Sequence, residues 1–213
     1  MSNPKQMSYD EFLAAAKAYG IDPAGAAAIM LQESKAKSFD DLGRPYILFE
    51  RHYFYKAVVK YKGVSLAKEL ARSHPTLCNA SATPAGGYGT SLQQWAKFDA
   101  AKDFCREAAI ESCSWGVGQV MGAHWKSLDY ESPQAMLNAM FRSEASQVEA
   151  IFRYLKANGL IKKLNDGDVT AVARGYNGAG FKKNSYDVKL AAHLKKCREL
   201  YGDDKLGTLE VFK

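Results

Sequence analysis

Apolar residues recur at helical spacing, between capping residues, along most of this 213-residue chain. Ser8 and Glu11 hold the two positions of a capping box before the run "FLAAAKAYG", which ends at Gly20. Asp22 and Pro23 open a second run, "AGAAAIMLQES", as the N-cap and the first helical residue. This pattern predicts a mainly α-helical protein.

Later segments continue the pattern. Residues 132–159 begin with Ser132 as N-cap and end at Gly159, and their unbroken apolar stripe predicts one helix. The run "YILFERH" (46–52) favours a strand, and glycines punctuate "CSWGVGQVMG" (113–122). We expect a mainly α (α+β) fold, a single helical domain over residues 1–213 with a small β-hairpin and an active-site groove. Further helices are predicted in "HYFYKAVVKYKG", "SLAKELARSH", "SLQQWAKFDAAKDFCREAAIES", "DGDVTAVARGYN" and "YDVKLAAHLKKCRELYG".

The composition, 47% hydrophobic and 24% charged residues, is that of a soluble globular protein. No apolar run follows a basic start, so we expect no signal peptide, and no stretch is long enough to span a bilayer. The four cysteines show no C-x-x-C pairing, which predicts reduced, buried thiols and no metal site. No dinucleotide-binding or P-loop motif is present, and we expect no cofactor.

Positive charge is concentrated toward the C-terminal end. The net charge is +6, yet residues 153–198 alone hold eleven Lys or Arg against three Asp, which gives +8. Such a region indicates an anionic partner, namely nucleic acid, phospholipid, lipopolysaccharide or cell wall, or simply a solvated helix face. No nucleic-acid partner is expected. The basic region shows neither a recognisable DNA-reading helix nor aromatic residues interleaved with the basic ones.

Glu33 ends an apolar helical stripe. Ala26, Ile29 and Met30 precede it at helical spacing on one face, so its carboxylate lies beside apolar side chains. A carboxyl group there must reach a wet rim or take a raised pKa. A glutamate at a helix end is more often a solvated terminus, so the position alone decides nothing.

Three motifs follow in order: "QES" (32–34), "SWGVGQVMG" (114–122) and "ARGYNGAG" (173–180). Together they resemble the goose-type lysozymes and soluble lytic transglycosylases, although Val117 and Gly118 replace the Leu and Met of that pattern. With "RPYILFERHYFYK", "FRSEASQVEAIFRYL" and "GFKKNSYDVKLA", the chain is more similar to the phage-type N-acetylmuramidase family of endolysin catalytic domains, over about residues 10–200. Many of those relatives carry an N-terminal wall-binding module, for which we expect no room here.

This resemblance implies a lysozyme-like fold and a glycoside hydrolase. It implies a phage endolysin that cleaves the β-1,4 bond between N-acetylmuramic acid and N-acetylglucosamine of peptidoglycan by general acid catalysis and so lyses the bacterial host. Glu33 is then the catalytic acid, since burial keeps a carboxyl group protonated near neutral pH. We expect a monomer that stays in the host cytoplasm until a membrane lesion admits it to the periplasm and cell wall.

Glu50 is the candidate for a second catalytic carboxylate. On a strand it shares one face with Tyr46 and Leu48, and an ion pair with Arg44 or Arg51 is the equal alternative. Carboxyl groups about 5 Å apart imply retention, and roughly 6.5–9.5 Å implies inversion. Weaker candidates are Asp40, Asp41 and Glu144.

Residues of the second and third motifs are the expected substrate-binding groups. Ser114, Gly116 and Gln119 would line a saccharide groove, where glycine lets backbone approach the sugar and the amide offers hydrogen bonds. The resemblance implies that Tyr176 and Asn177 hold the N-acetyl group, with the phenol close to the acid.

Three aromatic residues, Trp115, Trp125 and Tyr88, would either stack on sugar faces or belong to the core. His52 is interpreted as a structural hydrogen-bonding residue.

Two alternatives remain open at this level. A lytic transglycosylase would form 1,6-anhydromuramic products and would not need Glu50. A non-catalytic module would bind cell wall or nucleic acid through the basic end. Whether the chain is a hydrolase or a transglycosylase, its basic C-terminal helix could attract it to lipopolysaccharide. The basic residues of that helix include Lys189, Lys195, Lys196 and Arg198.

Overall fold

The computed structural model describes residues 6–33, 37–82 and 89–212. The chain divides into two compact units. The terminal unit comprises Met1–Ala36 and Ser143–Lys213, and the central unit comprises Lys37–Arg142. One unit is therefore built from both ends of the chain and the other from its continuous middle.

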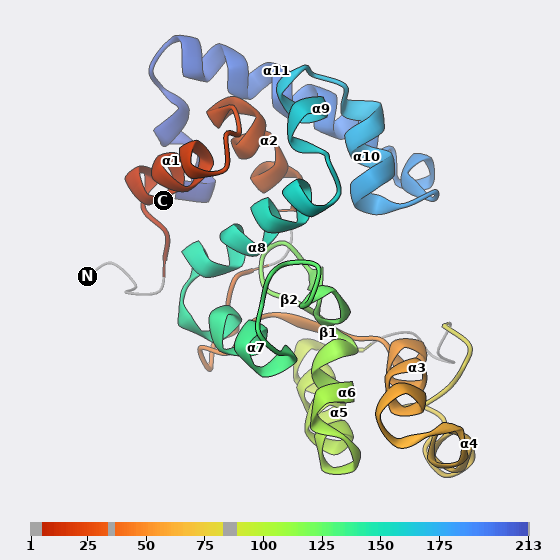
Figure 1. Ribbon diagram of the computed structural model, residues 1–213. Coiled ribbons are helices and arrows are strands. Elements are labelled where there is room, and N and C mark those ends of the chain that lie inside the picture. Colours follow the sequence, from red (N-terminus) through yellow and green to blue (C-terminus); the bar gives the residue numbers. More distant parts are fainter. Residues whose placement is uncertain (1–5, 34–36, 83–88, 213) are drawn as a thin grey trace. The chain divides into compact units, whose positions relative to one another are not determined.

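Helices and 3₁₀ turns are the regular elements that the structure describes in the terminal unit (Figure 1). Its helix α2 is buried at every position from Ala24 to Met30, and α11 packs along it. The phenyl rings of Phe12 and Phe152 meet at 6.4 Å in the same core. The elements are α1 (Tyr9–Ala18), α2 (Pro23–Glu33), α8 (Glu144–Ala157), α9 (Ile161–Asn165), α10 (Val169–Asn177) and α11 (Tyr186–Gly202), with 3₁₀ turns η2 (Phe181–Asn184), η3 (Leu206–Thr208) and η4 (Glu210–Phe212).

The predicted helix starts of this unit are confirmed. The Ser8 backbone N–H donates to the Glu11 carboxylate at 2.8 Å, and the Glu11 N–H donates to the Ser8 hydroxyl at 3.2 Å. The Asp22 carboxylate accepts from the Gly25 N–H at 3.3 Å, ahead of Pro23. Each bond satisfies a backbone donor that the first helical turn leaves without a partner.

The central unit combines helices with a three-stranded antiparallel sheet of order β1-β2-β3. Leu48 of β1 lies opposite Ser114 of β2, and Ser114 lies opposite Met121 of β3. The mainly α fold with a small hairpin is thus confirmed, with β1 as a third strand. The elements are β1 (Ile47–Phe49), α3 (Arg51–Lys62), α4 (Val64–Ser73), α5 (Ser91–Phe104), α6 (Arg106–Glu111), β2 (Cys113–Trp115), β3 (Val120–Met121), the 3₁₀ turn η1 (Gly122–His124) and α7 (Pro133–Arg142).

Two long helices predicted from the sequence are each broken into two. The expected helix over residues 132–159 is wrong, because α7 ends at Arg142 and Ser143 is fully extended (φ −166°, ψ 164°). The Ser143 hydroxyl then accepts from the Ser146 N–H at 3.2 Å and starts α8. Cys105 (φ −162°, ψ 107°) separates α5 from α6 in the same way. The first break coincides with the boundary between the units.

All four cysteines are buried and free: Cys78, Cys105, Cys113 and Cys197. Burial raises the pKa of the Cys78 and Cys197 thiols to about 11 and that of Cys113 well above its ordinary value. The thiols therefore stay protonated near neutral pH. In the described part of the chain, no helix has the length and apolar character needed to cross a membrane.

Candidate active site

Glu33 is the last residue of α2, three positions after Met30, where the buried segment of that helix ends. Burial raises the pKa of its carboxyl group above the ordinary value, and a hydrogen bond from Tyr186 acts in the opposite direction. Desolvation disfavours the charged form, so the net effect favours a protonated acid. This is the environment that the sequence predicted for position 33.

Tyr186 is the direct partner of this acid. It begins α11, its side chain is buried, and its hydroxyl donates to Oε1 of Glu33 at 2.6 Å. Burial and the nearby Glu33 charge raise the pKa of Tyr186, so the phenol keeps its proton and can act as the donor.

Tyr176 lies on α10 beside the same acid. Its ring stacks on that of Tyr186 with centroids 6.3 Å apart, and it meets the ring of Tyr154 edge-on at 5.2 Å. Burial, followed by the charge of Glu33, raises the pKa of the Tyr176 phenol well above its ordinary value. Asn177 ends the helix and is exposed, and Gly178 follows with φ 72°.

Sequence reasoning missed Tyr186. It assigned the phenol near the acid to Tyr176, whereas the hydroxyl that bonds the carboxyl group belongs to the first residue of the next helix. The signal was present in the run "NSYDVKLA", where a tyrosine stands at the start of an amphipathic pattern. No spacing rule connects position 186 to position 33, because 153 residues separate them.

The expected saccharide-binding residues of the central unit form one closed turn. Gly116 (φ 65°) and Gln119 (φ 45°) are left-handed, and the Gln119 N–H donates to the Gly116 carbonyl at 3.1 Å. The Gln119 side chain folds back, donating to the Gly116 carbonyl and accepting from the Ser114 hydroxyl, both at 2.8 Å. These bonds hold an uncommon non-glycine conformation and leave one amide N–H for a ligand.

Glu50 follows β1 and precedes α3, where its N–H donates to the Ser112 carbonyl at 2.8 Å. Tyr46, Leu48 and Glu50 are all partly exposed, whereas the intervening Ile47 and Phe49 are buried. The predicted shared face of Tyr46, Leu48 and Glu50 is therefore confirmed, although the strand itself ends at Phe49.

His52 and the Cys113 thiol lie near Glu50. Oε2 of Glu50 lies 3.3 Å from Nδ1 of His52, and its charge adds to burial in raising the pKa of the Cys113 thiol. Of the two arginines considered as partners, Arg44 pairs with Asp40 at 2.8 Å. Arg51 donates to the backbone carbonyls of Pro75 and Ser81, both at 3.0 Å.

The two tryptophans considered for sugar stacking differ in burial. Trp115 is fully buried against Trp95 and Phe98, so its suggested stacking on a sugar is wrong and the core interpretation holds. Trp125 is partly exposed, and its indole N–H donates to the buried Glu111 carboxylate at 2.7 Å.

Tyr88 and Ser34 lie outside the described residues. The weaker acid candidate Glu144 accepts from the Met7 N–H at 2.9 Å near the start of α8.

Comparison with known proteins gives one family and a similar solved structure. The Muramidase model, described as N-acetylmuramidase, matches residues 22–198. The crystal structure of the Burkholderia AP3 phage endolysin is similar with a TM-score of 0.83 and 32% sequence identity, covering 94% of this chain and 74% of that chain. No curated protein matches.

Proposed function

Because this chain belongs to the N-acetylmuramidase family, we propose that Glu33 is the general acid with which it cleaves the glycan strands of peptidoglycan. The family match and the similarity to a phage endolysin support a peptidoglycan hydrolase of the endolysin type. The bond cut is the β-1,4 linkage between N-acetylmuramic acid and N-acetylglucosamine.

One observation carries the assignment of Glu33: a partly buried carboxyl group, with a pKa raised by burial, bonded by a neutral phenol at 2.6 Å. A glycosidic oxygen leaves only when it is protonated as the bond breaks. A carboxyl group that still holds its proton near neutral pH supplies that proton, and general acid catalysis of this kind contributes about 10²–10⁴-fold. Tyr186 fixes the acceptor oxygen, which leaves Oε2 to carry the transferred proton.

The remaining candidates take supporting roles in this proposal. Tyr176 and Asn177 bind the N-acetyl group, and Ser114, Gly116 and Gln119 form a turn that contacts the sugar. The free amide N–H of Gln119 and the close backbone at Gly116 support that role. Glu50 is the proposed second carboxylate, which steadies the oxocarbenium charge or activates water.

The test compares wild type with Glu33→Gln in a turbidity assay on purified peptidoglycan. We expect the rate to fall by at least about 100-fold, because glutamine keeps the hydrogen bond from Tyr186 but has no acidic proton to transfer to the leaving oxygen. Glu199→Gln, the same change at an exposed position on α11, is the matched control. Lysis retained by Glu33→Gln would overturn the assignment.

Product masses separate hydrolysis from the transglycosylase alternative. Hydrolysis adds water, whereas an anhydro product is lighter by one water per cleaved bond. We expect the hydrolytic mass from wild type and strongly reduced cleavage by Glu50→Gln. Near-normal cleavage by that variant, with anhydro products, would establish the transglycosylase.

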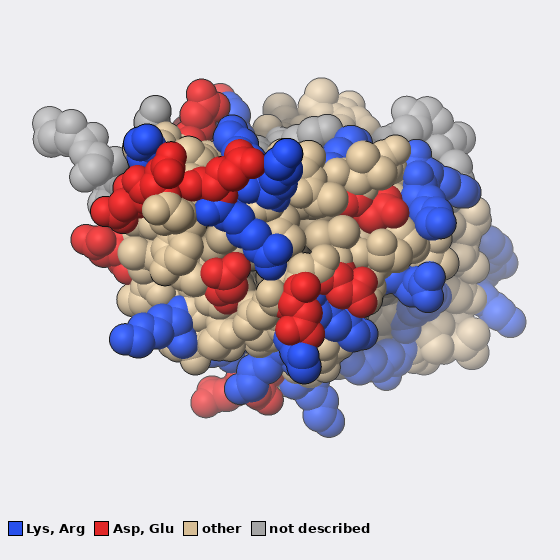
Figure 2. Space-filling view, turned by 90° about the horizontal axis from the view of Figure 1, so that it is seen from above, with Lys and Arg blue, Asp and Glu red and all other residues tan. Residues whose placement is uncertain are grey.

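We also propose the finer points of partner and location. In this proposal the chain acts as a monomer, and it reaches the wall from the host cytoplasm after membrane permeabilisation. Lys195 and Lys196 are exposed on α11 and could contact anionic lipopolysaccharide. On the face drawn in Figure 2, however, Lys and Arg are interspersed with Asp and Glu, so only a weak, salt-sensitive attraction is expected.

A further inference from the structure

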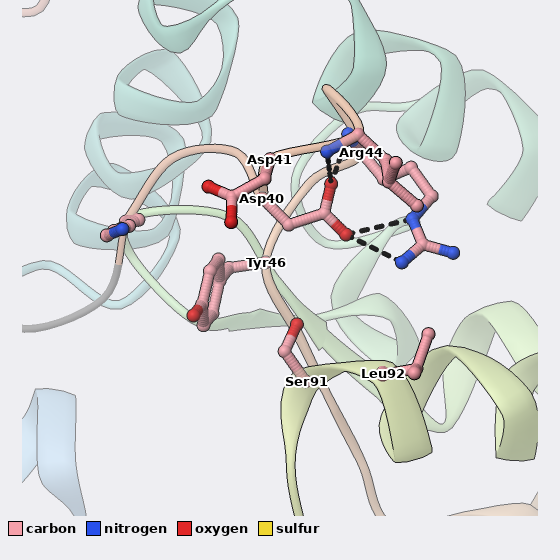
Figure 3. A pocket seen from close by; sticks show the side chains of 8 residues that line it. Asp40, Asp41, Arg44, Tyr46, Ser91 and Leu92 are labelled. Carbon is pink, nitrogen blue, oxygen red and sulfur yellow. Dashed lines mark hydrogen bonds and ion pairs between the residues drawn. The ribbon is translucent and has the colours of Figure 1, made fainter.

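A pocket of about 230 Å³ opens on the surface of the central unit, beside the turn that leads into β1 and the start of α5 (Figure 3). This volume is below the roughly 300–1,000 Å³ of pockets that enclose whole small-molecule ligands, so the pocket suits one residue-sized group. Its lining residues are Lys37, Asp40, Asp41, Leu42, Arg44, Tyr46, Ser91 and Leu92.

One wall of the pocket is rigid. Oδ2 of Asp40 accepts from Nε and Nη2 of Arg44, both at 2.8 Å, and Oδ1 accepts from the Leu42 and Arg44 N–H groups at 3.0 and 2.9 Å. The guanidinium carbon of Arg44 lies 4.9 Å from the ring centroid of Trp95. Although burial acts to raise it, these bonds hold the pKa of Asp40 below its ordinary value. The Asp40–Arg44 pair is thus a fixed, mutually neutralised frame.

Three other groups of the lining have no such partner. Among the described residues, neither the ammonium group of Lys37 nor the carboxylate of Asp41 has a hydrogen bond or ion pair, and Oγ of Ser91 is buried without a hydrogen-bond partner. Figure 3 shows Asp41, Tyr46 and Ser91 around the same opening. A buried hydroxyl without a partner carries a free-energy cost.

The charges indicate what the pocket takes. Lys37 and Asp41 are both exposed to solvent. A neutral sugar would form no ion pair with them, whereas a ligand with both a carboxylate and an ammonium group would pair with Lys37 and Asp41 respectively. Tyr46 lies on the same face as Leu48 and Glu50, so the pocket adjoins that face of β1. The Gly116 N–H donates to the carbonyl of Tyr46 at 2.7 Å, which links the pocket to the turn at Gly116.

We propose that this pocket binds the peptide stem of peptidoglycan through the zwitterionic end of a diamino acid. The inference rests on the proposed function, since it names the part of the same substrate that the central unit recognises. It adds a peptide-binding subsite to the sugar-binding turn at Ser114–Gln119, on the same sheet.

The test uses the full chain with Glu33→Gln, to prevent turnover, and a synthetic stem peptide ending in a diamino acid with free ammonium and carboxylate groups. We expect calorimetry to detect binding that Asp41→Asn and Lys37→Gln each weaken about fivefold or more, as loss of one ion pair in a partly solvated pocket predicts. Asp103→Asn, an exposed carboxylate on α5, is the matched control and should leave binding unchanged.

A second peptide, acetylated on the side-chain amine, makes the test specific. It should bind more weakly to the parent chain and be insensitive to Asp41→Asn, since each change removes the same ion pair. The proposal is overturned if the free peptide does not bind, if the variants leave its binding unchanged, or if Asp41→Asn instead weakens binding of a neutral N-acetylglucosamine oligomer. The lysis assay on Glu33→Gln stands apart from all of these outcomes, so the two proposals fail independently.

Discussion

Two opposed influences act on the carboxyl group at position 33. Burial favours its protonated form, whereas the phenol of Tyr186 donates to it and so favours the ionised form. The first effect is the larger, and the acid keeps a raised pKa. The hydrogen bond thus limits the pKa shift while it fixes the orientation of the group.

Removing the phenol hydroxyl should change the pH profile of the enzyme. In Tyr186→Phe the carboxylate loses a donor, so the pKa of Glu33 rises further and the alkaline limb of activity moves to higher pH. We also expect kcat to fall, because Oε2 is no longer oriented. The pH–rate profile of muropeptide release measures both effects, and exposed Tyr201→Phe is the control. An unchanged alkaline limb would mean that Tyr186 does not act on the acid.

The same shift predicts a pH-dependent stability. The folded chain holds the Glu33 proton more tightly than the unfolded chain, so this stabilisation is complete below the ordinary carboxyl pKa and is lost as pH rises through the raised value. In Glu33→Gln the side chain at position 33 has no titratable proton. The melting temperature of this variant should therefore exceed that of wild type increasingly as pH rises through that window. A constant difference across pH would contradict the raised pKa.

At this scale the sequence predicts the acid but not its environment. The apolar positions before Glu33 are visible because they lie on one helix at fixed spacing. Tyr186 reaches Glu33 only because α11 packs on α2. No local pattern encodes such a contact between distant segments.

At the level of elements, α6, β2 and η1 meet in close backbone contact at Gly122. A Cβ atom at Gly122 would lie 2.0 Å from the carbonyl oxygen of Ile110 and 3.0 Å from the indole nitrogen of Trp115, which itself donates to that carbonyl at 3.0 Å. Only glycine allows this approach of backbone to backbone.

Gly122→Ala should therefore destabilise the protein by about 3 kcal/mol, since the backbone cannot move away without breaking the Trp115 hydrogen bond. Urea unfolding measures the loss. Gly202→Ala, where no atom lies within 4 Å of the added Cβ, is the control and should change stability little. Equal stability of the two variants would show that the junction adapts.

Helix starts were predictable and helix breaks were not. The starts at Tyr9 and Pro23 carry local capping chemistry that can be read from a few letters. The break at Cys105 contains neither glycine nor proline, and apolar spacing continues across it. Ser143 does supply a capping hydroxyl, but the apolar spacing that continues across it pointed to one unbroken helix. Tertiary packing on each side decides where such a helix divides.

For the whole molecule, chain connectivity separates the two units. The central unit is one continuous segment, whereas the terminal unit must bring residues before Ala36 together with residues after Ser143. Closing that long loop costs entropy before the contacts between α2 and α11 form.

We therefore expect the central unit to fold first. In pulsed hydrogen exchange during refolding, amides of α5 and β2 should gain protection before those of α2 and α11. The tyrosine contact at Glu33 should appear with the slower phase. Simultaneous protection of all four elements would show that one nucleus spans both units.

The four buried thiols have a practical consequence. Each is a free thiol whose pKa is raised by burial, so its reactive thiolate form is suppressed near neutral pH. Alkylation then requires local opening, with Cys197 reporting on one unit and the other three on the second. The protein carries its own set of unfolding probes.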